Sequence, residues 1–152
     1  MITISLPYAI RGQLRTLLRR AGAREIGGIL MGEQIAEDHF RVVEFSVDET
    51  NGNAVHFNRN PEHHVAALDS FFRRTGADYR RFNYLGEWHS HPSFTVVPSR
   101  EDLLSMQDIV EGSDNFPFAA LLIVRLRWYV MLEAGSFMFM PHASPEQVSL
   151  TS

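Results

Sequence analysis

Two histidines, one serine and one aspartate stand at a spacing that can hold a metal ion. His89 and His91 lie in the run GEWHSHP at residues 86–92, and Ser99 and Asp102 follow. If this run is an extended strand, both imidazoles project from one face, because strand side chains alternate. Asp102, beyond a proline-bounded loop, can then supply a third ligand. Two histidines and one carboxylate, with a fourth position left for water, form a catalytic zinc site, so the pattern indicates hydrolysis.

Each of these residues also has an ordinary explanation. Ser99 and Asp102 precede an apolar run and fit a helix-capping box. A His-x-His pair on a strand can be an incidental feature of the surface or core. Glu25, just before a Gly-Gly apolar strand, can be a solvated charge. The fixed spacing of all these residues together is rarely produced by chance, however, and favours the metal site.

The combination resembles the JAMM motif of the MPN-plus metalloproteases. That motif is a glutamate followed at a distance by His-Ser-His-Pro, six residues, a serine, two residues and an aspartate. The matching residues here are Glu25, His89, Ser90, His91, Pro92, Ser99 and Asp102. The resemblance covers about residues 1 to 140. It implies a single α/β domain of the MPN-like (cytidine-deaminase-like) type, a mixed β-sheet flanked by helices.

The resemblance also implies a role for each residue. His89, His91 and Asp102 would bind Zn²⁺, which lowers the pKa of a bound water towards about 7. Glu25 would act as general base and then as general acid. Ser99 would donate a hydrogen bond to the oxyanion of the tetrahedral intermediate, and the same hydroxyl oxygen can still cap its helix.

Other polar residues near the motif remain open. Glu87 shares a strand face with the two histidines, so it is an alternative base or a group that supports a ligand. Trp88 points to the opposite face and is expected in the core. His63 and His64 fall in a first helical turn, where we expect exposed and inert side chains, and His56 is a further histidine without an assigned role.

Hydrophobic periodicity predicts the elements that position the motif. We expect helices over 8–21, 61–74 and from Ser99 to about 110. We expect strands over 2–5, 26–32, 39–48, 82–91, 118–125, 128–133 and 137–140. The predicted catalytic domain spans 1–142, and 143–152, which contains Ser, Pro and Gln, is predicted to be a flexible tail.

Composition limits the classes of partner and compartment. The chain has 152 residues and a formal charge of −4, so its composition does not indicate the excess of positive charge that favours nucleic-acid binding. It has no cysteine, which excludes catalysis by a thiol. We see no basic n-region and no apolar run of membrane-spanning length, and expect a cytoplasmic protein. All 14 of its Lys or Arg residues are arginines. Codon bias explains this, or else an advantage in offering no lysine amine.

The resemblance implies a substrate class that the residues alone do not. It suggests an isopeptidase or peptidase that cuts after the C-terminal glycine of a ubiquitin-like protein. Its partners would be that tail, its conjugated target and E1- or E2-like conjugating enzymes, in a setting such as antiphage defence. Segments 51–60 and 93–98 are candidate tail-binding loops. The alternatives are trimming of a sulfur-carrier protein in cysteine or cofactor synthesis, a non-catalytic MPN scaffold, and a generic zinc amidase.

Overall fold

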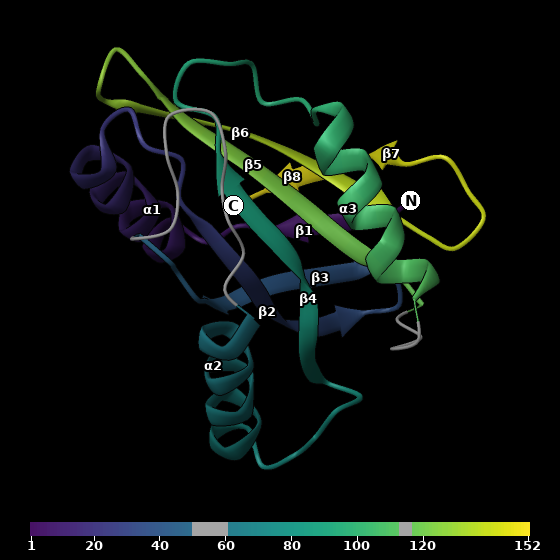
Figure 1. Ribbon diagram of the computed structural model, residues 1–152. Coiled ribbons are helices and arrows are strands. Elements are labelled where there is room, and N and C mark those ends of the chain that lie inside the picture. The colour runs from purple at the N-terminus through teal and green to yellow at the C-terminus, as the bar shows by residue number, and fades with distance from the viewer. Residues whose placement is uncertain (50–60, 113–116) are drawn as a thin grey trace.

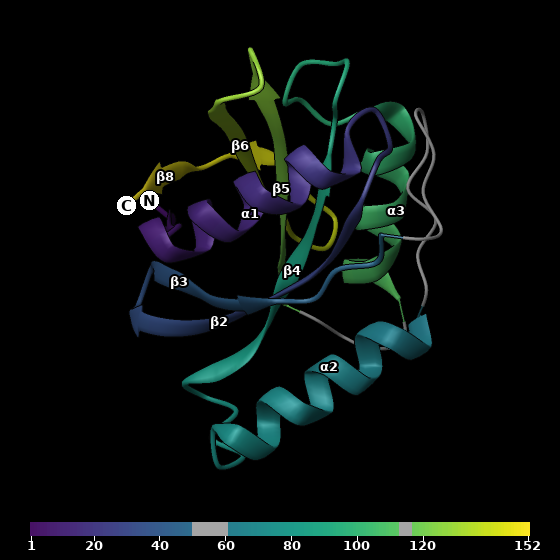
Figure 2. The ribbon, with the colours of Figure 1, turned by 90° about the vertical axis from the view of Figure 1, so that its left-hand side faces the viewer.

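One mixed sheet organises the chain. The computed structural model describes residues 1–49, 61–112 and 117–152. The strands are β1 (Thr3–Ser5), β2 (Gly27–Ala36), β3 (His39–Phe45), β4 (Phe82–Ser90), β5 (Ala119–Arg127), β6 (Met131–Phe139), β7 (Glu146–Gln147) and β8 (Ser149–Thr151). The helices are α1 (Tyr8–Ala21), α2 (Pro61–Arg74) and α3 (Arg100–Glu111). Figures 1 and 2 show the helices on both sides of the sheet.

Strand β4 lies in the middle of the sheet, whose order is β7-β6-β5-β4-β2-β3-β1-β8. It pairs antiparallel with β2 and parallel with β5, so that His89 stands between Gly27 and Ile123. A strand with neighbours on both edges has its backbone hydrogen bonds satisfied and its side chains held on fixed faces. The end of β4 is therefore a rigid platform for the histidines.

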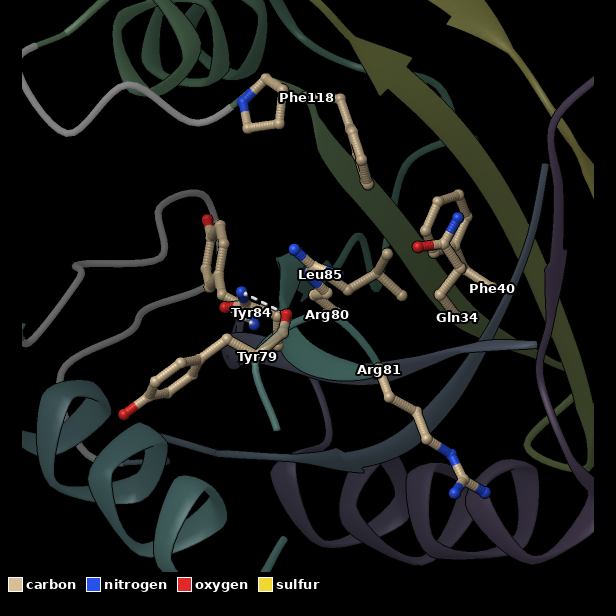
Figure 3. Close-up of a pocket in the computed structure, with 11 residues that line it drawn as sticks. Gln34, Phe40, Tyr79, Arg80, Arg81, Tyr84, Leu85 and Phe118 are labelled. Carbon is tan, nitrogen blue, oxygen red and sulfur yellow. Dashed lines mark hydrogen bonds between the residues drawn. The ribbon is translucent and has the colours of Figure 1, made fainter. Parts of the chain in front are cut away.

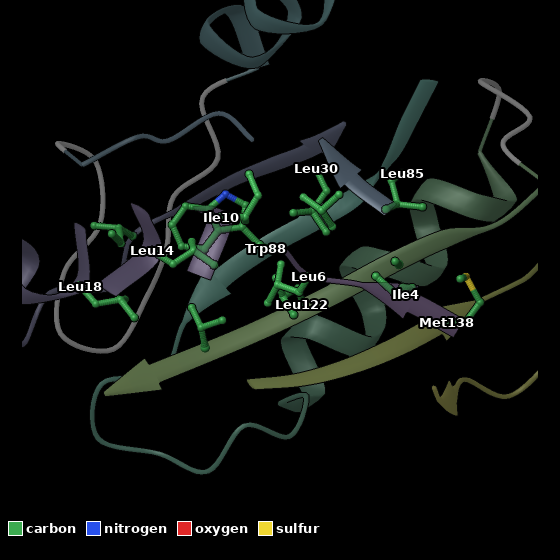
Figure 4. Packing of buried hydrophobic residues seen from close by; sticks show 14 of the residues in the cluster. Ile4, Leu6, Ile10, Leu14, Leu18, Leu30, Leu85, Trp88, Leu122 and Met138 are labelled. Carbon is green, nitrogen blue, oxygen red and sulfur yellow. The ribbon is translucent and has the colours of Figure 1, made fainter. Parts of the chain in front are cut away.

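Helix α1 covers one face of the sheet with the main hydrophobic core. Leu14 and Leu18 of the helix pack in the same buried cluster as Trp88 and Leu122 of the central strands, as Figure 4 shows. The apolar spacing along α1 that predicted a helix is the spacing that faces this core. Trp88 is fully buried, and its indole Nε1 donates to the Ser46 carbonyl at 2.8 Å, which confirms the expectation that it belongs to the core.

Helices α2 and α3 cover the opposite face. Met106 and Val110 of α3 pack against Leu121 and Ile123, which alternate along β5 with the residues that face α1. Phe71 of α2 packs in a separate buried cluster with two residues of β2. His89 occupies the β4 position between these two helices and shares their face, so the start of α3 approaches the metal strand from this side (Figure 2).

The C-terminal residues include two short strands. Residues 149–151 form β8, which pairs in parallel with β1, and Glu146–Gln147 forms β7 beside β6. Val148 and Leu150 pack against the main core, but two apolar residues in so short a stretch give no clear periodicity. The sequence predicted no strand in these residues, and their flexibility stays a prediction.

Two further details differ from the expected elements. The predicted strands at 128–133 and 137–140 form one continuous strand, β6, because Gly135 and Ser136 continue the ladder with β5 rather than breaking it. Residues 128–130 form the turn before it. Among the helices in the part of the chain that the structure describes, none combines the length and apolarity that a membrane crossing needs.

Candidate metal centre

Three ligand atoms converge where β4 ends and α3 begins. The Nε2 atoms of His89 and His91 are 3.1 Å apart. Asp102 Oδ2 lies 3.2 Å from the first and 3.3 Å from the second. Three ligands at about 2.0–2.1 Å from a tetrahedral zinc ion stand about 3.3 Å from one another. The three residues form a candidate metal site whose spacing suits an ion of this size.

The tautomer of His91 supports the same interpretation. Its Nδ1 lies 2.9 Å from the Thr95 carbonyl oxygen. A carbonyl only accepts, so Nδ1 carries the proton and, in the neutral ring, Nε2 presents a lone pair to the site. This lone pair and a carboxylate oxygen at 3.3 Å repel each other unless a cation or a proton lies between them. The donor set is therefore the kind that a metal ion satisfies.

Asp102 has a structural role at the same time as its place in the site. Ser99 is the N-cap of α3, and its Oγ accepts from the Asp102 backbone N–H at 3.1 Å. Asp102 Oδ2 accepts from the Ser99 N–H at 2.8 Å, which completes the capping box. The capping explanation is thus correct, and it also fixes the carboxylate that faces the histidines. Capping and metal binding are compatible here.

The pKa values of Asp102 and His91 are both shifted from their usual ranges. Burial raises the pKa of Asp102, but hydrogen bonds from His89, His91 and the Ser99 N–H, with the charge of His89, outweigh it and hold that pKa far below its usual range. Burial lowers the pKa of His91. The hydrogen bonds to Asp102 and to the Thr95 carbonyl, with the charges of Asp102 and Glu25, more than compensate and raise it. The site thus strongly favours positive charge facing an ionised carboxylate.

Glu25 is held beside the site by the first residues of β2. The Ile26 N–H donates to Ser90 Oγ at 3.0 Å, and the Ser90 N–H donates to the Ile26 carbonyl at 2.9 Å. This pair of bonds fixes the residue before β2 against the end of β4. Glu25 is only 5% exposed, and its charge contributes to the raised pKa of His91. A buried carboxylate therefore lies within electrostatic range of the candidate ligands without being one of them.

Two glycines allow this close approach of strands. A Cβ on Gly27 would lie 2.4 Å from the Trp88 carbonyl and 2.8 Å from the His89 Cβ. Gly86 adopts φ +155°, and a Cβ there would lie 1.9 Å from the Ala120 carbonyl. Sequence reasoning did not assign these glycines, nor the bond from Ser90 to Ile26. The signal available was glycine inside an apolar strand, which commonly marks a close backbone approach.

Among the other histidines and Glu87, His64 differs from its expectation. His64 is not exposed: it is 4% accessible, and its Nδ1 lies 2.6 Å from Ser46 Oγ, because α2 turns its first described residues towards β3. The side chains of His56 and His63 lie outside the described residues. Glu87 is buried on β4, and its catalytic role stays a prediction.

A separate pocket lies at the other end of β4, far from the ligands. It has a volume of about 200 Å³ and includes Tyr84 and Leu85 of β4, Phe40 and Phe118 (Figure 3). The candidate metal site is a polar cluster near the surface, with Asp102 half-buried and Ser99 exposed.

Comparisons with known proteins agree with this geometry. The family model of prokaryotic homologues of the JAB domain matches residues 7–141. A CD-NTase/cGAS isopeptidase from Enterobacter hormaechei is 28% identical over 137 residues, which are 82% of this chain and 67% of that protein.

Two solved structures share the fold. A protein from Desulfitobacterium hafniense superposes with a TM-score of 0.69 at 22% identity, covering 97% of this chain and 90% of that one. A protein from Salinibacter ruber gives a TM-score of 0.61 at 21% identity, covering 99% and 90%. With the family match over most of the chain, and with its JAMM-type ligands converging in space, this protein belongs to the prokaryotic JAB-domain family.

Proposed function

We propose that the chain is a zinc-dependent isopeptidase or peptidase that cleaves after the C-terminal glycine of a ubiquitin-like protein. The observation that carries the proposal is the convergence of His89, His91 and Asp102 within 3.3 Å of one another, beside the buried Glu25. Family membership and the similarity to an isopeptidase support the reaction class. Such a site joins a Lewis acid to a base, which amide hydrolysis needs.

His89, His91 and Asp102 are the residues that would hold the metal. When bound there, zinc lowers the pKa of a coordinated water towards about 7 and polarises the scissile carbonyl. The protein supplies the rest through fixed geometry. The Thr95 carbonyl orients His91, and the capping box orients Asp102, so the ligands are positioned before substrate arrives.

Glu25 moves the proton in this proposal. Its carboxylate accepts a proton from the attacking water and delivers it to the amine that leaves, which regenerates the base. Ser99 stabilises the charge that develops on the carbonyl oxygen. Its Oγ accepts from the Asp102 N–H, so the hydroxyl proton can be donated to that oxygen.

The substrate tail would approach over the loop that follows β4. Phe94 stands edge-on to His91, with ring centroids 5.9 Å apart, and forms an apolar wall beside the ligands. A flexible tail ending in glycine can pass such a wall in extended form and pair with a strand edge. Loop 93–98 remains a candidate contact, and the second candidate segment, 51–60, lies outside the described residues.

We place this activity in a bacterial antiphage conjugation system. The relative from Enterobacter hormaechei is named for its action on CD-NTase/cGAS, so a CD-NTase carrying a ubiquitin-like modifier is the first conjugate to test. E1- and E2-like conjugating enzymes would then be functional neighbours. Reversal of conjugation and processing of a modifier precursor are both within the proposed chemistry.

Metal content and cleavage, measured together, test the proposal. We expect close to one zinc per chain by elemental analysis of the wild type and none in Asp102→Ala. Cleavage of a ubiquitin-like protein fused through its C-terminal glycine should require the metal and stop with a chelator, while thiol-alkylating reagents should do nothing. A wild-type protein that binds no zinc, or that holds zinc and cleaves no such fusion, would contradict the proposal.

A further inference from the structure

The turn between β5 and β6 exposes four large apolar side chains in a row. The exposed fractions are 73% for Trp128, 86% for Tyr129, 60% for Val130 and 57% for Met131. We call residues 127–131 the hairpin tip. Isolated exposed apolar residues are common, but a contiguous group of this kind usually marks a contact surface. Trp and Tyr are moreover enriched at the energetic centres of protein interfaces.

The backbone of the hairpin tip is unfavourable for the residues that occupy it. Trp128 and Tyr129 both have positive φ, at 52° and 62°. The Val130 N–H donates to the Arg127 carbonyl at 3.1 Å, which closes a two-residue turn. Turns with two positive φ values favour Asn-Gly, because side chains with a bulky Cβ substituent are strained there. Neither stability nor solubility explains two aromatic residues at these positions.

Two arginines lie beside the hairpin tip, and one of them, Arg127, also pairs with Glu133 at 3.4 Å. The Arg127 guanidinium lies 4.9 Å from the Trp128 ring centroid, and Arg19 Nε donates to the Tyr129 carbonyl at 3.3 Å. Arg19 belongs to α1, whose sequence YAIRGQLRTLLRRA contains four arginines and no acidic residue. The whole chain is nevertheless negative, at −4. The tip and the last turn of α1, which carries Arg19, therefore form a basic and aromatic surface that suits an acidic partner.

The hairpin tip lies at the same end of the sheet as the candidate metal site. The His91 N–H donates to the Val124 carbonyl at 2.9 Å, and Arg125 donates to the Phe94 carbonyl at 2.8 Å. Trp128 follows Val124 by four residues, which is about 14 Å along a strand. Figures 1 and 2 both show the tip and the loop after β4 protruding side by side.

We infer that the hairpin tip is a docking surface for the folded domain of the ubiquitin-like protein whose tail enters the metal site, through an acidic face of that domain with an apolar patch. The inference rests on the proposed function. A folded domain of 100 residues has a radius of gyration of about 13 Å, so a domain held at the metal site extends over the tip. Trp128 and Tyr129 insert into the apolar patch, and Arg19 and Arg127 face its acidic border.

The test replaces the aromatic pair with the residues that the turn favours. The double variant Trp128→Asn/Tyr129→Gly fits the same backbone, so its melting temperature should not fall. Glu25→Gln serves as the non-cleaving background, and the probe is a ubiquitin-like domain fused through its C-terminal glycine to a CD-NTase. We expect the dissociation constant for the probe to rise at least tenfold in the double variant, and to rise with added salt and with Arg19→Glu.

Tyr8→Ala is the matched control. Tyr8 is 75% exposed at the start of α1, away from the tip, so its loss should leave binding within twofold of the background. Equal binding of the probe by the background and the double variant would overturn the inference, as would no binding by either. Tip-dependent binding to phosphatidylserine vesicles, or tip-dependent self-association, without an effect on the probe would also overturn it by assigning the tip to another partner.

The two proposals fail in distinguishable ways. If the Glu25-containing enzyme cleaves the fusion and the tip variant binds as tightly as the control, only the docking inference is wrong. If binding depends on the tip but the wild type cleaves neither the fusion nor a short peptide ending in its tail, only the isopeptidase activity is wrong.

Discussion

Two buried glutamates stand near opposite ends of β2, and they have opposite surroundings. Glu25 precedes the strand and is 5% exposed, while Glu33 lies within it and is 4% exposed. Glu33 accepts hydrogen bonds from Arg41 and from Arg81. Glu25 lies instead close enough to His91 for its charge to help raise the pKa of that histidine. The same residue type at the same depth thus meets two cations at one end and a candidate metal site at the other.

The difference shows that burial alone does not identify a catalytic carboxylate. The hydrogen bond from Arg41 lowers the pKa of Glu33 and outweighs burial, with Arg81 adding to the effect. Glu33 is held ionised by fixed partners and has no proton to exchange near neutral pH. Glu25, in the proposed function, lies beside the metal and exchanges a proton with the attacking water. The groups around a buried carboxylate, rather than its degree of burial, therefore distinguish a structural glutamate from a candidate catalytic one.

The largest expected effect is that of Glu25→Gln on turnover. General base catalysis contributes about 10²–10⁴-fold to rate, so we expect kcat on the fusion substrate to fall by about this factor. The ligands are untouched, so zinc content by elemental analysis and the melting temperature should stay close to those of the wild type. This result would separate loss of a base from loss of the metal.

Glu87→Gln is the matched control for that variant. Glu87 is also buried and lies on the metal strand, two residues before His89. We expect it to retain turnover within a few fold of the wild type. A Glu25→Gln enzyme at nearly full rate, together with an inactive Glu87→Gln enzyme, would transfer the role of base to Glu87.

Glu33→Gln should show the opposite pattern, a loss of stability with activity retained. A glutamine cannot accept both charged hydrogen bonds, and the change weakens a buried group at a cost of about 1–3 kcal/mol. The arginines are partly exposed, at 45% and 60%, so water replaces part of the interaction. Chemical denaturation should show the lower stability, and an inactive but stable Glu33→Gln protein would contradict the comparison.

Acid should remove the contribution of Glu33 in a predictable window. A carboxyl group whose pKa is lower in the folded state stabilises the fold above its unfolded value, here 4.5, and loses that effect as the pH falls towards the folded value. The stability gap between wild type and Glu33→Gln should therefore be full near pH 6 and shrink below about pH 4.5. Urea unfolding at several pH values measures it, and a gap that grows on acidification would show that Glu33 is not ionised in the fold.

The metal ligands could be predicted because their chemistry depends on local spacing. A His-x-His pair on a strand fixes two ligands on one face, and a helix N-terminus three residues before Asp102 fixes the third. The pairing of Glu25 with this cluster depends on contact between strands far apart in sequence. Only the resemblance to a known motif connected Glu25 to the histidines before the structure did.

Other features could not be read from the sequence. The burial of His64 follows from where α2 packs against the sheet, which the local pattern of a first helical turn does not contain. Strand β8 is formed by tertiary pairing with β1 rather than by its own three-residue periodicity. The aromatic hairpin tip contradicts the Asn-Gly preference of its turn, so local propensity predicts a strand through 128–130 instead.

The smallest expected effect concerns the absence of lysine, which the same comparison sharpens. Arg41 and Arg81 need guanidinium geometry, because they share the carboxylate of Glu33, Arg41 from β3 and Arg81 from the turn before β4. Arg73 and Arg80 are exposed, and within the described ranges of the chain neither side chain forms a hydrogen bond or ion pair that requires arginine over lysine. We therefore expect Arg73→Lys and Arg80→Lys to leave melting temperature and turnover unchanged.

If avoidance of conjugation explains the composition, co-expression with the activating and conjugating enzymes should attach the modifier to the new lysines, visible as a mass shift that the wild type lacks. Unmodified variants, under conditions in which other proteins are conjugated, would leave codon usage as the explanation, because guanidinium geometry accounts for arginine at Glu33 but not at these exposed positions.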